Sequence, residues 1–516
     1  MFEAFEVGHK ITREAFAARE PELRMALLTA QRLALAKQRA VIVLVAGIEG
    51  AGKGEVVARL NEWLDTHFVQ THAFWDQAET DNERPPFWRF WQCLPPRGNV
   101  AVMFGSWYTD PIIEFAAGSI GKARFERALQ RIVEFEQAIS QDGAIIVKFW
   151  FHLSKKAQKK RLAADSERNL KPVSKVAGQS RYYAQFSRAA ERAIRGTAVI
   201  DAPWHIIAAE HDHYRDLTFG ETLLSVLQAR LADDEVAPST STAKSTAAST
   251  STARAPVNEP LSTIVDAAAP STSDLAPRRT LLDRVDLSQS LPEGEYQARL
   301  DKLHAQLREL SWRARAARLS SVVMFEGWDA AGKGSAIRRV TQAMDPRLYR
   351  VIPTSTPTDE ERAHHYLWRF WRHVPPRGYM TIYDRSWYGR VLVERVEQFA
   401  NANEWGRAFQ EINDFEEQLT EQGMLLVKFW LHIDTQTQRE RFRERELTPH
   451  KQHKIGPSDY RNLELRASYE TAVADMVAKT STRCAPWALI AANDKLFARV
   501  EVLKTLCSRL RDALDD

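Results

Sequence analysis

Residues 327–335, Gly-Trp-Asp-Ala-Ala-Gly-Lys-Gly-Ser, have the types and spacing of a loop that binds phosphate. Gly327 and Lys333 are the ends of the pattern G-x-x-x-x-G-K, whose glycines let backbone N–H groups turn toward phosphate oxygens. The lysine adds a positive charge, and a helix that follows adds the positive end of its dipole. We therefore expect phosphate contacts from Lys333 and from four small residues: Gly327, Gly332, Gly334 and Ser335.

Two carboxylates are candidates for a magnesium site. The residue after the lysine of this pattern is usually Ser or Thr, whose hydroxyl binds magnesium, but here it is Gly334. Asp329, inside the loop, offers the oxygen ligand that magnesium prefers. Asp384 ends the apolar stretch YMTIY, and the ends of parallel strands open onto a ligand crevice. We expect Asp329 and Asp384 to bind Mg²⁺; the alternative for Asp384 is an N-cap of the next helix.

An arginine beside the second carboxylate completes a catalytic set. Arg385 follows Asp384 directly, and an arginine there can pair with a phosphate during its transfer. The candidate catalytic residues are therefore Asp329, Lys333, Asp384 and Arg385. They predict magnesium-dependent phosphoryl transfer, in which positioning and charge neutralisation replace covalent chemistry.

The basic segment 437–459 is a candidate lid. Phosphoryl transfer requires that water be excluded and that spread negative charge be neutralised, and a closing segment provides both. We expect four of its cations to contact phosphate: Arg441, Arg445, Lys451 and Lys454. The alternative is a solvated basic helix with no ligand.

Apolar stretches between helical segments indicate the elements that position these residues. The stretches 321–326, 349–354, 379–383, 424–433 and 487–492 are mostly apolar without alternation, as in strands of a parallel sheet covered on both faces. A three-layer α/β fold follows. Within WRFWRHVPPRG we expect Trp368, Phe370 and Trp371 to belong to the core.

The chain contains an internal duplication. Lys53 precedes Lys333 by 280 residues, and at this offset 11 of the 21 residues in 88–108 are identical to those in 368–388. The matched segments near the C-terminal ends of the two copies, 202–212 and 485–495, are offset by 283. A constant offset over such a distance indicates two tandem domains, a first half (1–231) and a second half (280–516).

The first half lacks the predicted catalytic set. The correspondences are Asp384 to Phe104, Arg385 to Gly105 and Asp329 to Glu49. Loss of one metal ligand and of one transition-state cation typically reduces phosphoryl transfer by several powers of ten. We interpret the first half as catalytically inactive, although Gly52, Lys53 and Gly54 leave anion binding open.

Composition limits the remaining possibilities. The net charge is +4 on 71 basic and 67 acidic residues, so we expect no nucleic-acid or membrane partner. Three cysteines without metal-ligand spacing, an N-terminus unlike a signal peptide and the lack of a long apolar run predict a cytoplasmic protein. Residues 232–279, rich in Ala, Ser, Thr and Pro, predict a disordered linker.

Several motifs together resemble the polyphosphate kinase 2 family: GWDAAGKGS, YDRSWYGRVLVERV, LVKFWLHI, HKIGPSDYRN and APWALIAANDKLFAR. The resemblance implies tandem folds like that of thymidylate kinase and phosphorylation of nucleotides by inorganic polyphosphate. It also implies that Asp329 and Asp384 hold magnesium, and that Lys333, Arg385 and lid residues such as Lys454 contact phosphate. The fused arrangement is similar to that of enzymes that convert AMP to ADP.

Other acceptors and donors stay open at this point. A polyphosphate-driven kinase that acts on ADP or GDP is the first alternative, and an ATP-dependent nucleoside monophosphate kinase is the second. Gly389 stands where relatives often carry an acidic residue, which leaves the nucleotide contacts of that segment undecided. The duplication suggests that one chain imitates a dimer, and a homo-oligomer also stays open.

Overall fold

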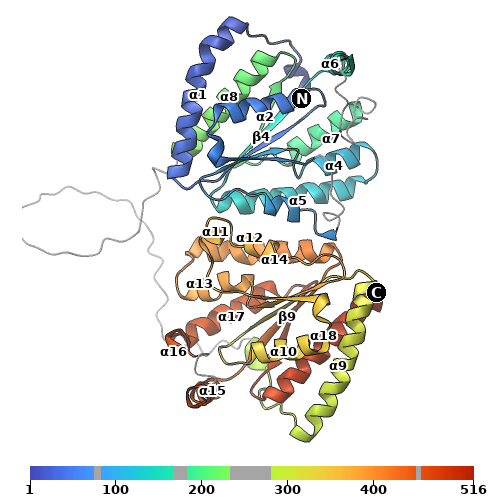
Figure 1. Cartoon of the computed structure of the whole chain (residues 1–516), viewed down its shortest axis with the longest axis vertical. Helices are drawn as coiled ribbons and strands as arrows, with labels where there is room; N and C mark the ends of the chain where they lie inside the picture. Colours follow the sequence, from blue (N-terminus) through green and yellow to red (C-terminus); the bar gives the residue numbers. More distant parts are fainter. Residues whose placement is uncertain (75–82, 168–182, 233–280, 449–454, 516) are drawn as a thin grey trace, which may run out of the picture.

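The computed structural model of the chain describes residues 1–74, 83–167, 183–232, 281–448 and 455–515. The predicted linker lies outside this part of the chain from residue 233 onward, and so do the lid candidates Lys451 and Lys454. Two α/β units follow one another along the chain and lie end to end (Figure 1).

Each unit alternates strands and helices. In the first half the strands are β1 (Val41–Gly47), β2 (Val69–Ala73), β3 (Val100–Phe104), β4 (Ile145–His152) and β5 (Trp204–Ala208). The helices are α1 (Arg13–Ala36), α2 (Lys53–Trp63), α3 (Trp88–Gln92), α4 (Thr109–Ala116), α5 (Lys122–Gln141), α6 (Lys155–Glu167), α7 (Tyr183–Gly196) and α8 (Asp212–Ala232).

The second half repeats this order. Its strands are β6 (Ser321–Gly327), β7 (Tyr349–Pro353), β8 (Met380–Asp384), β9 (Leu425–His432) and β10 (Trp487–Ala491). Its helices are α9 (Glu293–Ala316), α10 (Lys333–Ala343), α11 (Asp359–Arg362), α12 (Trp368–Trp371), α13 (Val393–Val396), α14 (Ala402–Glu421), α15 (Thr435–Leu447), α16 (Pro457–Glu464), α17 (Arg466–Thr480) and α18 (Lys495–Asp515).

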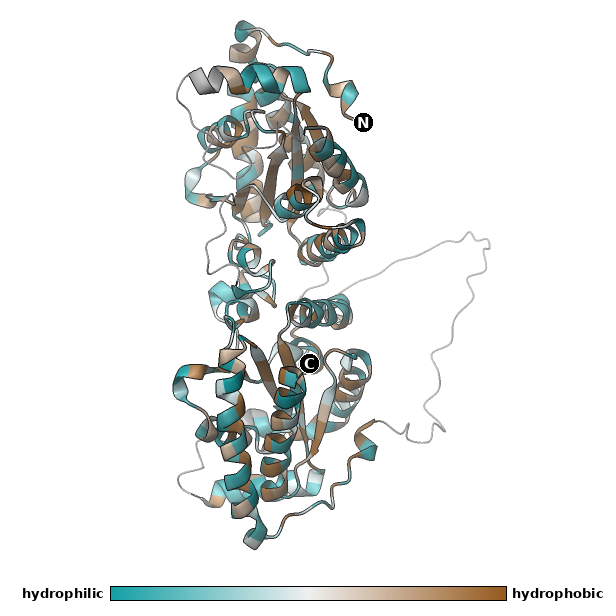
Figure 2. Ribbon diagram, turned by 90° about the vertical axis from the view of Figure 1, so that its right-hand side faces the viewer, coloured by the Kyte–Doolittle hydropathy of each residue, from teal (hydrophilic) through white to brown (hydrophobic). Residues whose placement is uncertain are grey.

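Both sheets have five parallel strands in equivalent orders, β2-β3-β1-β4-β5 and β7-β8-β6-β9-β10. Helices cover both faces, and the apolar strands form the interior of each unit (Figure 2). The prediction of tandem three-layer α/β folds with parallel sheets is confirmed. Trp368, Phe370 and Trp371 are buried, so the prediction that they are core residues is also confirmed.

The sheet order positions the site. In the second half β6 lies between β8 and β9, with Phe325 paired to Asp384 across the β6–β8 ladder. The loop that follows β6 therefore begins beside the end of β8. Because ligands bind outside the carboxyl ends of parallel strands, this edge is the expected place for the predicted residues to meet.

Aromatic and ionic contacts join the two halves. Trp91 and Trp371 are equivalent residues of the duplication, and their rings stack with centroids 5.7 Å apart. Arg131 of α5 forms ion pairs of 2.9 Å with Glu417 and Glu421 of α14. Helix α5 thus faces α12 and α14 across the junction (Figure 1).

A second pair of contacts shows that the junction is nearly symmetric. Arg84 donates from Nε to the carbonyl oxygen of Val374, at 3.3 Å. His364 is the counterpart of Arg84, and Leu94 is the counterpart of Val374. The side chain of His364 forms a hydrogen bond with the backbone of Leu94. Equivalent residues that contact one another in both directions are the mark of a two-fold interface. The arrangement fits the expectation that one chain imitates a dimer.

Among the helices that the structure describes, none combines the length and apolar character needed to cross a membrane. Cys93, Cys484 and Cys507, all of which the structure describes, form no disulfide.

Candidate active site

The glycine loop of the second half connects β6 to α10. Gly327 has φ +148°, and a Cβ there would lie 2.5 Å from the carbonyl oxygen of Leu431, so only glycine allows this approach. Lys333 donates from Nζ to the carbonyl oxygens of Gly327 and Trp328, at 2.6 and 3.2 Å. These bonds hold the ammonium group inside the loop. Burial, together with the nearby Arg385, lowers the pKa of Lys333.

Asp329 is held by two donors. Its Oδ1 accepts from Nη2 of Arg385 and its Oδ2 from Nδ2 of Asn462, both at 2.9 Å. Burial alone would raise the pKa of Asp329, but the charges of Lys333 and Arg385 and the bond from Asn462 lower it below its ordinary value. The side chain is therefore an ionised carboxylate at neutral pH, aimed at the centre of the site.

Arg385 has an unusual backbone conformation. Its φ is +64°, a region that costs a non-glycine residue about 1–2 kcal/mol. Its counterpart Gly105 has φ +76°, so the same turn exists in the first half without the strain. Its backbone N–H donates to Phe325, and its own carbonyl accepts from the hydroxyl of Thr354. The second half thus keeps a strained residue at a position from which its guanidinium reaches Asp329.

Asp384 is the last residue of β8 and lines the same groove as Asp329. The N-cap alternative is wrong, because the cap of the next helical turn, Trp387–Arg390, is Ser386, whose side chain accepts from the N–H of Tyr388. Ser386 is fixed in turn by a buried acid that the sequence analysis missed. Glu326 accepts from the backbone N–H and the hydroxyl of Ser386, at 2.7 and 2.9 Å.

The sequence contains one feature that could have drawn attention to Glu326, because it is the single charged residue in the apolar strand SVVMFEG. Burial raises its pKa, and its counterpart in the first half is Ala46. Glu326 therefore stabilises the turn that presents Asp384 and Arg385. The first half, which lacks counterparts of Asp384 and Arg385, also lacks this acid.

A groove with a volume of about 590 Å³ runs over the glycine loop. Asp329, Asp384 and Arg385 lie along it. Its other cations are Lys333, Arg338, Arg339, Arg441, Arg445, Lys495 and Arg499. Gly332 and Gly334 have no atom within 4 Å of the place of a Cβ, so the loop opens onto this space. The groove therefore fits an extended anion.

A smaller cleft, with a volume of about 80 Å³, also borders Asp329. Its walls are largely apolar and include Leu392, Val393 and Trp430. Asp329 and Arg385 line both cavities. Asp329 and Arg385, two of the four candidate catalytic residues, thus lie where a cationic groove meets an apolar cleft.

Arg441 also lines the groove, but its guanidinium is bound by the protein itself. The guanidinium is buried and donates to four carbonyl oxygens, those of Ala330, Ala331, Ala492 and Asn493, at 2.7–3.2 Å. Through these bonds the guanidinium of Arg441 holds the glycine loop against the end of β10. Arg445, one turn further along α15, lines the groove as expected of a lid cation.

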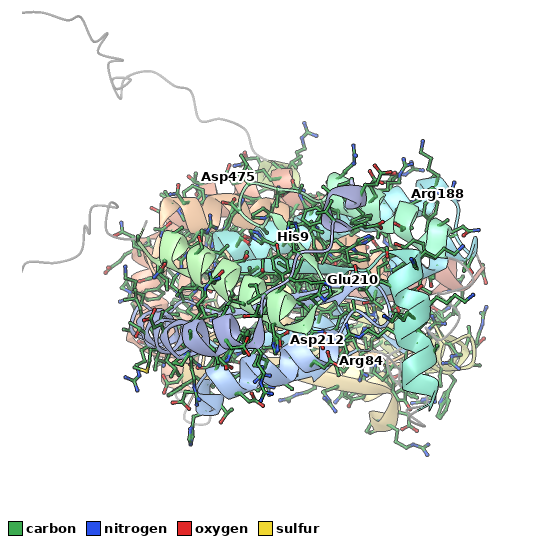
Figure 3. All side chains as sticks on the ribbon, turned by 90° about the horizontal axis from the view of Figure 1, so that it is seen from above. His9, Arg84, Arg188, Glu210, Asp212 and Asp475 are labelled. Atoms are coloured by element: carbon green, nitrogen blue, oxygen red, sulfur yellow. The ribbon has the colours of Figure 1, made fainter. Side chains whose placement is uncertain are left out.

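The glycine loop of the first half is closed. Lys53 makes the same carbonyl contacts as Lys333, to Gly47 and Ile48. The guanidinium of Arg215 lies so close to Gly52 that a Cβ there would come within 1.7 Å of Nη1. Arg215 donates to Glu55 and Asp212, at 2.7 and 3.1 Å (Asp212 is labelled in Figure 3). Side chains of the protein therefore occupy the space that is open over Gly332.

Both halves match the family model described as polyphosphate kinase 2, over residues 10–235 and 290–516. The chain belongs to the polyphosphate kinase 2 family. The resemblance predicted from its motifs is thereby confirmed. A crystal structure described as a polyphosphate kinase 2 from Pseudomonas aeruginosa PA01 matches this fold with a TM-score of 0.86, at 44% identity and with 100% of both chains covered.

Curated relatives of this chain include proteins of the same length and shorter ones. The polyphosphate:AMP phosphotransferase of Pseudomonas aeruginosa is 46% identical over 510 residues, 98% of each chain. That of Pseudomonas syringae pv. tomato is 45% identical over 520 residues, 99% of each chain. The GDP-polyphosphate phosphotransferase of Mycobacterium tuberculosis is 34% identical over 220 residues, 43% of this chain and 75% of that protein.

Proposed function

We propose that this protein transfers the terminal phosphate of inorganic polyphosphate to AMP, giving ADP, and that the second half carries the reaction. The observation that carries the proposal is the meeting of two cavities at Asp329 and Arg385. The cationic groove suits a polyphosphate donor, and the apolar cleft suits the approach of a nucleoside acceptor. The two full-length relatives that are named for polyphosphate and AMP support this choice of substrates.

The described side chains act by position and charge. Backbone N–H groups of the glycine loop and the ammonium group of Lys333 hold the phosphate next to be transferred. Arg385 pairs with Asp329 at 2.9 Å, and its side chain is 54% exposed, so it can turn toward the moving phosphoryl group. It neutralises charge that develops in the transition state, which in related reactions is worth about 10³–10⁵ in rate.

The residues of the site are compatible with magnesium. Within the described residues no group of three or more His, Cys, Asp and Glu side chains could hold a metal ion. Magnesium, however, commonly binds one or two carboxylates and completes its shell with substrate phosphates and water. Asp329 and Asp384, which line one groove, would hold it, and when bound it would neutralise phosphate oxygens.

Helices α15 and α16 cover the site and limit access of water. Asn462 of α16 contacts Asp329, and Gln438 of α15 donates to the backbone carbonyl of Asp329 at 3.1 Å. Arg441, Arg445, Lys451 and Lys454 stay predicted phosphate contacts. We propose that this cover favours transfer to a nucleotide over transfer to water.

A second candidate acceptor is a nucleoside diphosphate. Shorter relatives named for GDP or ADP are 33–37% identical over 43–44% of the chain. An ATP-dependent nucleoside monophosphate kinase is the less favoured candidate, because the loop has Gly334 where such enzymes have a hydroxyl. The three cysteines form no disulfide, which fits a cytoplasmic protein. The cytoplasmic location stays a prediction, as do the homo-oligomer and the lack of nucleic-acid and membrane partners.

The test is turnover by the purified chain with magnesium. AMP is offered with polyphosphate and, separately, with ATP, and products are separated by chromatography. ADP formed only with polyphosphate supports the proposal. ADP formed mainly with ATP would overturn the donor, and product formed only from ADP or GDP would overturn the acceptor. Activity that persists without magnesium would overturn the metal requirement.

A further inference from the structure

A cavity with a volume of about 80 Å³ lies at the junction of the two halves. None of its described lining residues belongs to the cationic groove over the glycine loop. Its walls include Glu83 and Arg84 of the first half and Arg318, Arg377 and Gln422 of the second. Three guanidinium groups therefore meet one carboxylate among the described residues. Since a single water needs about 10–15 Å³, the cavity has room for several waters or for one tetrahedral oxyanion.

The arginines of this cavity are held by few contacts. Arg84, which is labelled in Figure 3, donates from Nε to the carbonyl oxygen of Val374 at 3.3 Å. Arg318 pairs with Glu83 at 3.1 Å, but the two side chains are 59% and 38% exposed, and such a pair is weak. Arg377 is exposed, and no hydrogen bond or ion pair joins its guanidinium to another described residue. Arg377 is therefore available to a ligand.

The near two-fold symmetry of the junction gives this cavity a counterpart. At the offset of 280, Arg377 corresponds to Arg97 and Gln422 corresponds to Asp142. Arg97 and Asp142 line a smaller cavity, with a volume of about 30 Å³, and pair with each other at 3.0 Å. Asp142 also pairs with Arg407 at 3.4 Å. The smaller cavity therefore balances its arginine with an acid of its own, and Gln422 replaces that acid in the larger cavity.

The other two arginines are also specific to the larger cavity. Arg318 corresponds to Gln38 and Arg84 corresponds to His364, and both counterparts line the smaller cavity. Burial lowers the pKa of His364, so this side chain is uncharged at neutral pH. Among the described residues, the larger cavity has three arginines and one acid, whereas the smaller cavity has one arginine and one acid. Equivalent positions of the duplication thus make only the larger cavity strongly cationic.

We propose that the cavity lined by Arg84, Arg318 and Arg377 binds inorganic phosphate, and that the bound ion links the two halves. A guanidinium group binds phosphate oxygens through two parallel N–H donors. The amide of Gln422 can donate to the ion, whereas an acid at this position would repel it. Because Arg84 belongs to the first half and Arg377 to the second, one ion would contact both. The inference does not depend on the reaction that we propose, and its alternative is a solvated set of arginines that binds no ion.

The experiment measures binding of inorganic phosphate by equilibrium dialysis at constant ionic strength. Four full-length proteins are compared: wild type, Gln422→Asp, Arg377→Gln and the control Arg97→Gln. Gln422→Asp gives the larger cavity the acid of its counterpart, so Arg377 should pair with it as Arg97 pairs with Asp142. The control removes the arginine at the equivalent position of the smaller cavity. Thermal unfolding without phosphate checks that each variant is folded.

We expect wild type and the control to bind one phosphate more per chain than Gln422→Asp, whether or not the glycine loop binds a phosphate of its own. In Arg377→Gln the dissociation constant of this site should rise about tenfold or more, since a hydrogen bond to a charged group is worth at least that factor. Sulfate, which is also a tetrahedral dianion, should compete with phosphate for the site. Phosphate should raise Tm more in wild type and the control than in the two variants, because an ion that binds only the folded junction stabilises it.

Two outcomes would overturn the inference. Equal numbers of bound phosphates in all four proteins would show that the larger cavity binds no ion and that its arginines are only solvated. A loss of binding in Arg97→Gln as large as that in Arg377→Gln would refute the assignment to this cavity. Neither outcome bears on the proposed reaction, which is tested separately by turnover with polyphosphate and AMP.

Discussion

Replacing Arg385 by the residue of the first half should separate activity from stability. In Arg385→Gly the guanidinium is lost from Asp329, and with it a transition-state cation, so kcat with polyphosphate and AMP should fall by about 10³–10⁵. The same change relieves a φ of +64°, which is worth about 1–2 kcal/mol. Against this gain, the lost exposed ion pair costs up to about 1 kcal/mol.

The matched control is Arg385→Ala, which removes the same guanidinium but keeps the strained backbone. Both variants should be equally inactive, and the glycine variant should be the more stable by about 1 kcal/mol, or a few degrees in Tm. Steady-state kinetics and thermal unfolding, run side by side, measure the two effects. Activity of Arg385→Gly within tenfold of wild type, or an alanine variant as stable as the glycine variant, would refute the reasoning.

Three further predictions concern other parts of the molecule. Asp384→Asn should abolish turnover while Lys53→Ala keeps most of it; a strong loss in the second would contradict an inactive first half. Asn462 helps to lower the pKa of Asp329, which keeps this carboxylate ionised at a lower pH than an ordinary aspartate. Asn462→Ala should therefore move the acid limb of the kcat/KM profile to higher pH, and an unmoved limb would argue against the bond. Trp91→Ala, at a buried position of the junction, should cost about 3–5 kcal/mol in denaturant unfolding, and a loss below about 1 kcal/mol would mean that the two halves are not coupled there.

The sequence was informative about the sheet and about the residues at its edge. Continuous apolar runs mark central strands because both faces of a parallel sheet are buried. Once strands 321–326 and 379–383 are assigned, Asp329 and Asp384 must follow them on the same edge, and the structure places both along one groove. This meeting could be predicted because the end of each strand is visible in the local sequence, and parallel pairing brings the strand ends to the same edge of the sheet.

The roles of individual arginines could not be predicted in this way. Helix α15 reads TQTQRERFREREL, with arginines at every second residue and no apolar pattern that selects a face. Burial of Arg441 depends on four carbonyl groups from two distant loops, which no local signal announces. Arg215 in the first half was missed for the same reason, since its partner Glu55 is 160 residues away.

The first half, which we predict to be catalytically inactive, has a physical reason to persist. Trp371, which stacks on Trp91 of the first half, also packs edge-on against Phe415, at 4.8 Å between centroids. Phe415 in turn packs against Trp387, two residues after Arg385. The surface that the first half covers is thus the back of the turn that presents Arg385. If selection acts on the first half only to keep this surface covered, the residues of the junction are retained while the catalytic residues of its glycine loop can be lost. The closure of the loop at Gly52 by Arg215 is consistent with such a loss.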